Sequence, residues 1–148
     1  MLVQNFIENA AVNVISASFA SASVSGWNIY QGLFANATNA KIVFPCVKII
    51  CWTEKELYPE VHSGLRDVDL EIRTDAIKTQ TSSSIFESVS DLVFNPFLTG
   101  SIYTQMSNYA PNINFKLICE AADGLQTITD QDGWVASQGL KIVCERTS

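Results

Sequence analysis

Positive charge is scarce in this chain of 148 residues. Nine Lys and Arg stand against fifteen Asp and Glu, a net charge of −6, and only 16% of the residues are charged. Proteins that grip nucleic-acid phosphates concentrate Lys and Arg on one face, so this balance argues against tight nucleic-acid binding. This charge balance does not argue against a protein past which nucleic acid slides without being gripped.

The chain also lacks the paired cysteines of a zinc site. Its four cysteines, Cys46, Cys51, Cys119 and Cys144, form no Cys-x-x-Cys pair, and the one histidine, His62, is distant from them. A structural zinc site needs four close sulfur or nitrogen ligands, so we expect no metal. All four cysteines lie in apolar runs, which predicts buried free thiols and a reducing compartment.

Long apolar runs and catalytic motifs are missing as well. No segment reaches the ~18 consecutive apolar residues of a membrane helix, and residues 1–22 do not have the basic start of a signal peptide. There is no P-loop, no Gly-x-Gly-x-x-Gly and no His-Glu-x-x-His. His62, Ser63 and Asp67 have the residue types of a hydrolase triad, but without a nucleophile-elbow pattern they favour a mobile loop. We expect no membrane contact, catalytic residue or cofactor.

Helix patterns, by contrast, are clear. Apolar residues at three- and four-residue steps predict an amphipathic helix over 2–22, ended by Gly26. The pattern Ser84-Ile85-Phe86-Glu87 predicts Ser84 as the N-cap of a helix over 84–98, which Pro96 ends. Two segments are less regular: 26–40, interpreted as a turn or short helix before a loop, and 97–108, interpreted as a short helix. The polar face of the first helix comprises Asn5, Glu8, Asn9 and Asn13.

The most informative part of the chain is a pair of predicted strands over 41–76. Residues 41–52 form an almost continuous apolar strand, in which Pro45 favours an edge position or the outer side. Residues 66–76 alternate, with one apolar face and one polar face. The charged loop predicted between them, 53–65, is longer than a usual hairpin connection and is a candidate for an assembly contact. Its candidate residues are Glu54, Lys55, Glu56, Tyr58 and His62.

Two closing strands are predicted over 112–120 and 138–146, with turns at Asp123-Gly124 and Asp132-Gly133 and a short strand over 125–128 between them. The first is expected to carry Ile113, Phe115, Leu117 and Cys119 on one side, and the second to carry Leu140, Ile142 and Cys144 inward. Consecutive strands without an intervening helix favour antiparallel pairing. The prediction is a single α+β domain over 1–148, with a mainly antiparallel sheet of about four strands packed against two or three helices.

The polar face of the alternating strand is a candidate functional surface. It carries Asp67, Asp69, Glu71 and Arg73 and is mostly acidic. Carboxylates could hold a metal ion or perform acid–base chemistry, but both need converging partners that the sequence does not supply. We therefore interpret this face as solvated, as lining a lumen, or as meeting a neighbouring subunit.

This layout resembles the tail-terminator (tail-completion) proteins of tailed bacteriophages, and more broadly their small neck and minor tail proteins. The resemblance rests on the order of elements: an initial helix, the strand Phe44-Pro45-Cys46-Val47-Lys48-Ile49, a polar loop ending in Ser63-Gly64, the strand 66–73, a helix over 85–94 and two closing strands. It covers most of the chain, while residues 26–34 and 121–138 depart from it.

The resemblance implies a virion structural protein without catalysis. Such a protein forms a homohexameric ring that caps the tail tube and joins it to the head-side neck, while DNA passes through the lumen. It implies a tail-tube partner, a sheath partner in a contractile phage, and a head-side connector or stopper, with synthesis in the host cytoplasm. Two alternatives remain: a small hydrolase that uses His62 with a carboxylate, and a module that holds a small ligand or sugar on the aromatic segment 26–34.

Overall fold

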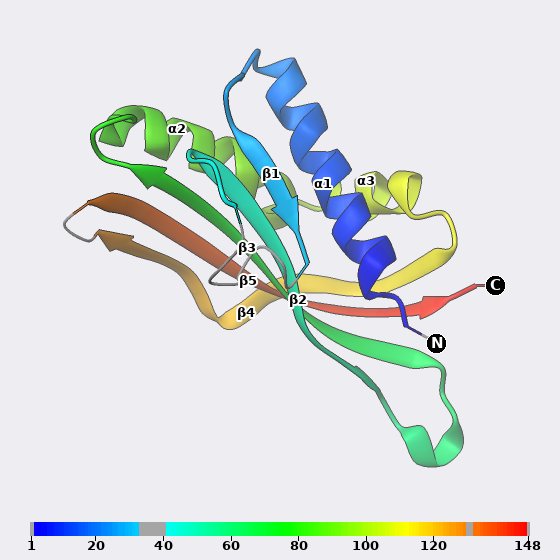
Figure 1. Ribbon diagram of the computed structural model, residues 1–148. Helices are drawn as coiled ribbons and strands as arrows, with labels where there is room; N and C mark the ends of the chain where they lie inside the picture. Colours follow the sequence, from blue (N-terminus) through cyan, green and yellow to red (C-terminus); the bar gives the residue numbers. More distant parts are fainter. Residues whose placement is uncertain (1, 33–40, 130–131, 148) are drawn as a thin grey trace.

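The computed structural model describes residues 2–32, 41–129 and 132–147, and in these residues five strands form a twisted sheet that three α-helices cover on one face (Figure 1). The strand order is β1-β2-β3-β5-β4. β1 runs parallel to β2, and the other neighbours are antiparallel. The predicted α+β class with a mainly antiparallel sheet is thus confirmed.

The elements have the following bounds, with η marking a 3₁₀ helix: α1 Gln4–Ser21, β1 Asn28–Gln31, β2 Cys46–Glu56, η2 Pro59–Val61, β3 Leu65–Ile77, α2 Ser83–Phe94, η3 Asn95–Leu98, α3 Ile102–Tyr109, β4 Ile113–Thr129 and β5 Gly133–Arg146. β2 and β3 continue beyond the helices as a projecting hairpin, seen at the lower right of Figure 1. No helix in the described segments is long and apolar enough to cross a membrane.

The core lies between the helices and the inward face of the sheet. The alternation of β3 buries Val68, Leu70 and Ile72, each at most 2% exposed, as the sequence predicted. They belong to one apolar cluster with side chains of α2, namely Phe86, Val89 and Val93. The opposite side chains of β3 are thereby fixed on the other face of the sheet.

The segment 26–40 differs from the prediction, because it contains β1 rather than a turn or helix. β1 pairs with the first half of β2, with Asn28 opposite Cys46. Trp27 stacks against Phe86 with ring centroids 6.5 Å apart, which fixes the entry to this strand. Four residues are too few for a strand period to stand out. The loop expected over 33–40 lies outside the described residues.

β2 begins and ends later than predicted. Pro45 precedes the strand and accepts a hydrogen bond from the Asn28 N–H at 3.1 Å, so it occupies neither an edge strand nor an outer side. At the other end, 53–56 belong to β2, and the connection shrinks to 57–64. The charged residues there form cross-strand pairs, Lys55 opposite Asp67 and Glu56 opposite Arg66, which stabilise a strand.

The N-cap of α2 is Ser82 rather than Ser84. The Ser82 hydroxyl accepts a hydrogen bond from the Ile85 N–H at 3.3 Å, so the first turn begins two residues earlier than the capping-box pattern indicated. Consecutive serines at 82–84 offer equivalent cap side chains, which is why the pattern alone did not select one. The predicted end before Pro96 and the short helix that follows, α3, are present.

β4 is one long strand with two bulges. No turn occurs at Asp123-Gly124; the register instead jumps between Glu120 and Leu125, and Gly124 has φ +63° within the second bulge. The first bulge, between Phe115 and Leu117, shifts the alternation by one residue. Leu117 is consequently 40% exposed and Cys119 half-buried, so they do not share the buried side of Ile113 and Phe115 as predicted, and Cys119 is not a fully buried thiol. The reversal near Asp132-Gly133 agrees with the prediction, since β5 begins at Gly133.

Candidate functional site

The candidate residues of β3 lie on the face of the sheet opposite the helices, which we call the outer face. It comprises the outward side chains of β2, β3 and β5, with Asp67, Asp69, Glu71 and Arg73 along its centre. Asp69 is exposed, Asp67 is only 5% exposed, and Glu71 and Arg73 are half-buried. The strand expected to be solvated is therefore largely enclosed by its neighbours.

Four cations lie beside two carboxylates of the outer face. Lys141 Nζ of β5 donates to Asp67 Oδ2 at 3.0 Å, and Lys55 Nζ of β2 lies 3.9 Å from the same oxygen. The hydrogen bond with Asp67 raises the pKa of Lys141. In a second cluster, Lys48 Nζ of β2 and Arg73 Nε of β3 each lie 3.2 Å from Asp75 Oδ2. The outer face thus carries cations beside its carboxylates, whereas the sequence indicated a mostly acidic face.

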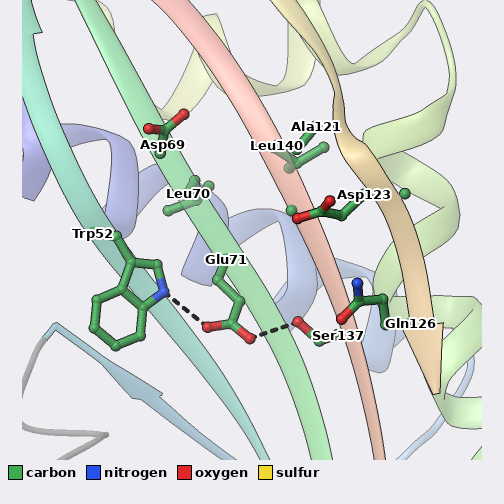
Figure 2. A pocket seen from close by; sticks show the side chains of 11 residues that line it. Trp52, Asp69, Leu70, Glu71, Ala121, Asp123, Gln126, Ser137 and Leu140 are labelled. Atoms are coloured by element: carbon green, nitrogen blue, oxygen red, sulfur yellow. Dashed lines mark hydrogen bonds between the residues drawn. The ribbon is translucent and has the colours of Figure 1, made fainter. Parts of the chain in front are cut away.

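Glu71 ties three strands together through its carboxylate. Trp52 Nε1 of β2 donates to Oε1 at 2.8 Å, and Ser137 Oγ of β5 donates to Oε2 at 2.5 Å (Figure 2). A bulge between Cys51 and Thr53 takes Trp52 out of the register, and the side chain remains 47% exposed. The result is an anchored aromatic side chain beside carboxylates.

A pocket of about 420 Å³ opens on the outer face between this aromatic and β4 (Figure 2). Its polar and aromatic lining comprises Trp52, Asp69, Glu71, Asp123, Gln126 and Ser137. The second bulge of β4 forms one wall, and it approaches β5 at Gly139, where an added Cβ would lie 3.0 Å from the Ala121 Cβ. An indole beside carboxylates suits a cationic or hydroxyl-rich group. This pocket could not be predicted from the sequence, because the glycine in the bulge of β4 has the pattern of a turn.

Glu54 of the candidate assembly loop has a role within its own chain. Its carboxylate accepts the N–H groups of Val3 and Gln4 at 3.0–3.1 Å and the Arg66 Nε–H at 2.8 Å. Val3 has no polar side chain with which to cap α1, so Glu54 supplies the anionic cap from β2. Glu54 is therefore a strand residue that fastens α1 to the hairpin, and it is not a loop contact.

The remaining loop candidates, Tyr58 and His62, lie in the connection 57–64 at the tip of the hairpin. Both have left-handed backbone conformations, with φ of 53° and 50°. Ser63 donates its hydroxyl hydrogen to the Leu57 carbonyl, and Asp67 is bonded to Lys141. The structure thus engages Ser63 and Asp67 elsewhere and does not assemble the triad-like set with His62.

Glu8 is a buried carboxyl group that the helix pattern placed on the polar face of α1. It is 4% exposed and accepts the Cys51 N–H at 3.1 Å. Burial raises the pKa of Glu8, while hydrogen bonds from the backbone of Cys51 and Gly32 oppose that rise. Glu8 therefore satisfies the edge of β2 just beyond the point where β1 ends.

All four cysteines are free thiols, with Cys46, Cys51 and Cys144 buried and Cys119 half-buried. Burial raises the pKa of Cys46 and of Cys144 to about 12. Among the described residues, no three His, Cys, Asp or Glu side chains stand close enough to hold a metal ion. No protein-family model matches this chain, and no curated protein matches it in sequence.

Proposed function

We propose that this protein is a structural component of a tailed-phage virion: a tail terminator, or a related neck protein, that forms a hexameric ring. One observation carries the proposal. Apart from β1 and α3, which the resemblance does not include, the elements follow the order α1, β2, β3, α2, β4, β5 on which the resemblance to tail terminators rests, and they fold as one sheet with its helices on one face. The projecting β2–β3 hairpin adds a surface suited to subunit contact.

In this proposal the ring caps the tail tube and joins it to the head-side connector or stopper, and DNA passes through its lumen. A sheath protein is a further partner in a contractile phage. The pairing of charges on the outer face supports passage without retention. Lys55 and Lys141 lie beside Asp67, and Lys48 and Arg73 lie beside Asp75, while Asp69 and Glu71 add two further carboxylates to the same face. The positive charges of these four cations are therefore balanced by four carboxylates of β3. DNA affinity depends on cations that can replace the counterions of phosphates.

The proposal assigns no catalysis to the chain. Light scattering of the purified protein together with electron microscopy tests the ring directly. We expect a homo-oligomer whose class averages show six-fold symmetry and a central opening. A monomer that persists at high protein concentration would contradict the proposal.

A second candidate function, binding of a small ligand, is favoured by the pocket beside Trp52. Its volume of about 420 Å³ is sufficient for a small ligand. Titration of the protein with sugars and with amines, followed by tryptophan fluorescence, tests this function. Saturable quenching that Trp52→Phe abolishes would support it, and unchanged fluorescence at high ligand concentration would count against it.

A further inference from the structure

The pocket beside Trp52 carries an excess of negative charge. Three carboxylates line it, those of Asp69, Glu71 and Asp123, and the described lining residues include no Lys or Arg. Lys141 is opposite Asp69 in the strand register, but its ammonium group donates to Asp67 at 3.0 Å. These charges favour a positively charged occupant.

The aromatic wall distinguishes this pocket from an ordinary acidic surface. The indole of Trp52 is 47% exposed, and its Nε1–H donates to Glu71 Oε1 at 2.8 Å, which fixes one end of the ring at the side of the pocket (Figure 2). A cation close to the face of an indole is attracted by the electron density of the ring. The same ring face can also cover an apolar group attached to the cation.

The carboxylates differ in what they can still bind. Glu71 already accepts hydrogen bonds from both Trp52 and Ser137, so it positions the indole. Asp69 is exposed and accepts one hydrogen bond through Oδ2, from the Thr53 hydroxyl at 2.7 Å. Asp123 is exposed as well. Since a carboxylate has about four acceptor positions, Asp69 and Asp123 can receive N–H donors from a ligand.

Small residues make room for the rest of such a ligand. Gly139 of β5 is opposite Glu71 in the register, and Gly124 lies in the second bulge of β4, so neither places a side chain in the pocket. Ala121 is the neighbouring residue of β4 in the lining. A volume of about 420 Å³ is sufficient for a small organic molecule.

We propose that this pocket binds a small organic amine as its ammonium ion. Its ammonium group donates hydrogen bonds to Asp69 and Asp123, and its apolar body lies against the face of Trp52. The proposal rests on the second candidate function, binding of a small ligand, and names the class of that ligand as an amine rather than a sugar. It does not depend on the ring.

Calorimetric titration of the protein with phenethylammonium and with phenethyl alcohol tests the ligand class. The two compounds have the same number of non-hydrogen atoms, and only the first is charged. We expect the ammonium compound to bind about ten-fold or more tightly than the alcohol, because the ion pairs and the cation–π contact are available to it alone. The difference should shrink as salt concentration rises.

Two variants, Asp69→Asn and Asp123→Asn, remove one charge each and keep the side-chain shape. Each should weaken binding of the ammonium compound by about two- to five-fold and leave binding of the alcohol unchanged. The matched control is Asp91→Asn, which removes the same charge from an exposed position of α2 outside the pocket. Circular dichroism of each variant checks that it is folded.

The outcomes separate the ligand class from ligand binding itself. Equal affinities for the two compounds, or an equal loss of affinity in Asp91→Asn and in the pocket variants, would overturn the assignment of an amine. If sugars then quench the fluorescence of Trp52 in a saturable way, the small-ligand function would stand without it. A protein that binds neither the amine, the alcohol nor the sugars would overturn both.

Discussion

At the scale of single residues, two buried carboxylates join elements that are distant in sequence. Glu54 caps α1 from β2, and Glu8 reaches from α1 to the edge of β2. Neither role follows from an amphipathic pattern, because both carboxylates occupy positions at which a polar side chain is expected to face water. Their significance comes from the backbone N–H groups that they satisfy.

Substitution of Glu8 separates the contribution of its hydrogen bond from that of its charge. Glu8→Ala leaves the Cys51 N–H without its acceptor and is expected to lower the free energy of unfolding by about 1–3 kcal/mol. Glu8→Gln keeps an acceptor and is expected to cost less. Urea unfolding followed by circular dichroism measures both variants.

Wild type and Glu8→Gln are also expected to differ in how their free energy of unfolding depends on pH. Since burial raises the pKa of folded Glu8 above 4.5, the folded state binds this proton more tightly than the unfolded state. Wild-type stability should therefore fall as pH rises from 4.5 through the raised pKa, and Glu8→Gln should lack this component. The unfolding free energy of Glu8→Gln minus that of wild type is expected to increase as pH rises from 4.5 through the raised pKa of Glu8. A difference that does not change with pH would show that Glu8 is not perturbed.

The alternation of β3 sets a second prediction at this scale. Leu70 is 2% exposed beneath the helices, and Leu70→Ala is expected to cost about 2–5 kcal/mol in the free energy of unfolding. Leu117→Ala is a matched control, because the first bulge of β4 leaves Leu117 40% exposed, and its effect should stay within about 0.5 kcal/mol. Similar costs for the two variants would show that the faces are misassigned.

At the scale of elements, the sequence predicted those helices and strands in which apolar residues recur with a strong period. α2 carries a regular apolar stripe and β3 a strict alternation. Both ends of β3 and the start of α2 lie within two residues of their predicted positions, whereas α2 ends at Phe94, four residues before the predicted limit at 98. β1 is too short to show a period, and the two bulges of β4 break the alternation. The outer face was predictable as the polar side of β3. The side chains that contact this face from neighbouring strands, Trp52, Ser137 and Lys141, could not be predicted. Their positions depend on the register of strand pairing, which the sequence does not show.

The bulge of β4 that shapes the pocket depends on the small side chain of residue 139. Gly139→Ala places a Cβ 3.0 Å from the Ala121 Cβ, and we expect a loss of about 1–3 kcal/mol as β4 is pushed aside. Ala121→Gly in the same chain removes the opposing Cβ and should recover part of that loss. Thermal unfolding of the two single variants and the double variant measures the coupling. Strictly additive effects would contradict a direct contact between these positions.

At the scale of the whole molecule, the two sides of the sheet have different roles. The helices bury one face in a continuous core, while the outer face carries ion pairs within β3 and between β3 and its neighbours. The hairpin that projects beyond the helices and the open edge strand β4 give the chain two unlike surfaces. Such an asymmetric unit suits head-to-tail assembly, and the outer face then either lines the lumen or meets the neighbouring subunit.

Reversing the sign of exposed charges on the outer face distinguishes a face that lines the lumen from a face that meets the neighbouring subunit. Asp67 is buried and Glu71 is half-buried, and both hold cross-strand hydrogen bonds, so they are unsuitable. Asp69, which accepts an exposed hydrogen bond from Thr53, and Asp123 are both exposed. We therefore combine Asp69→Lys with Asp123→Lys. The control combines Glu87→Lys with Asp91→Lys, which makes the same charge change on exposed positions of α2.

If the outer face lines the lumen, the outer-face variant should assemble into rings that now retain DNA, because free cations there replace the counterions of phosphates. The measured affinity should fall steeply as salt concentration rises, and control rings should not retain DNA. If the outer face meets the neighbouring subunit, only the outer-face variant should fail to form rings. Rings of the outer-face variant that assemble normally and bind DNA no better than wild type would place this face toward bulk solvent and contradict both roles.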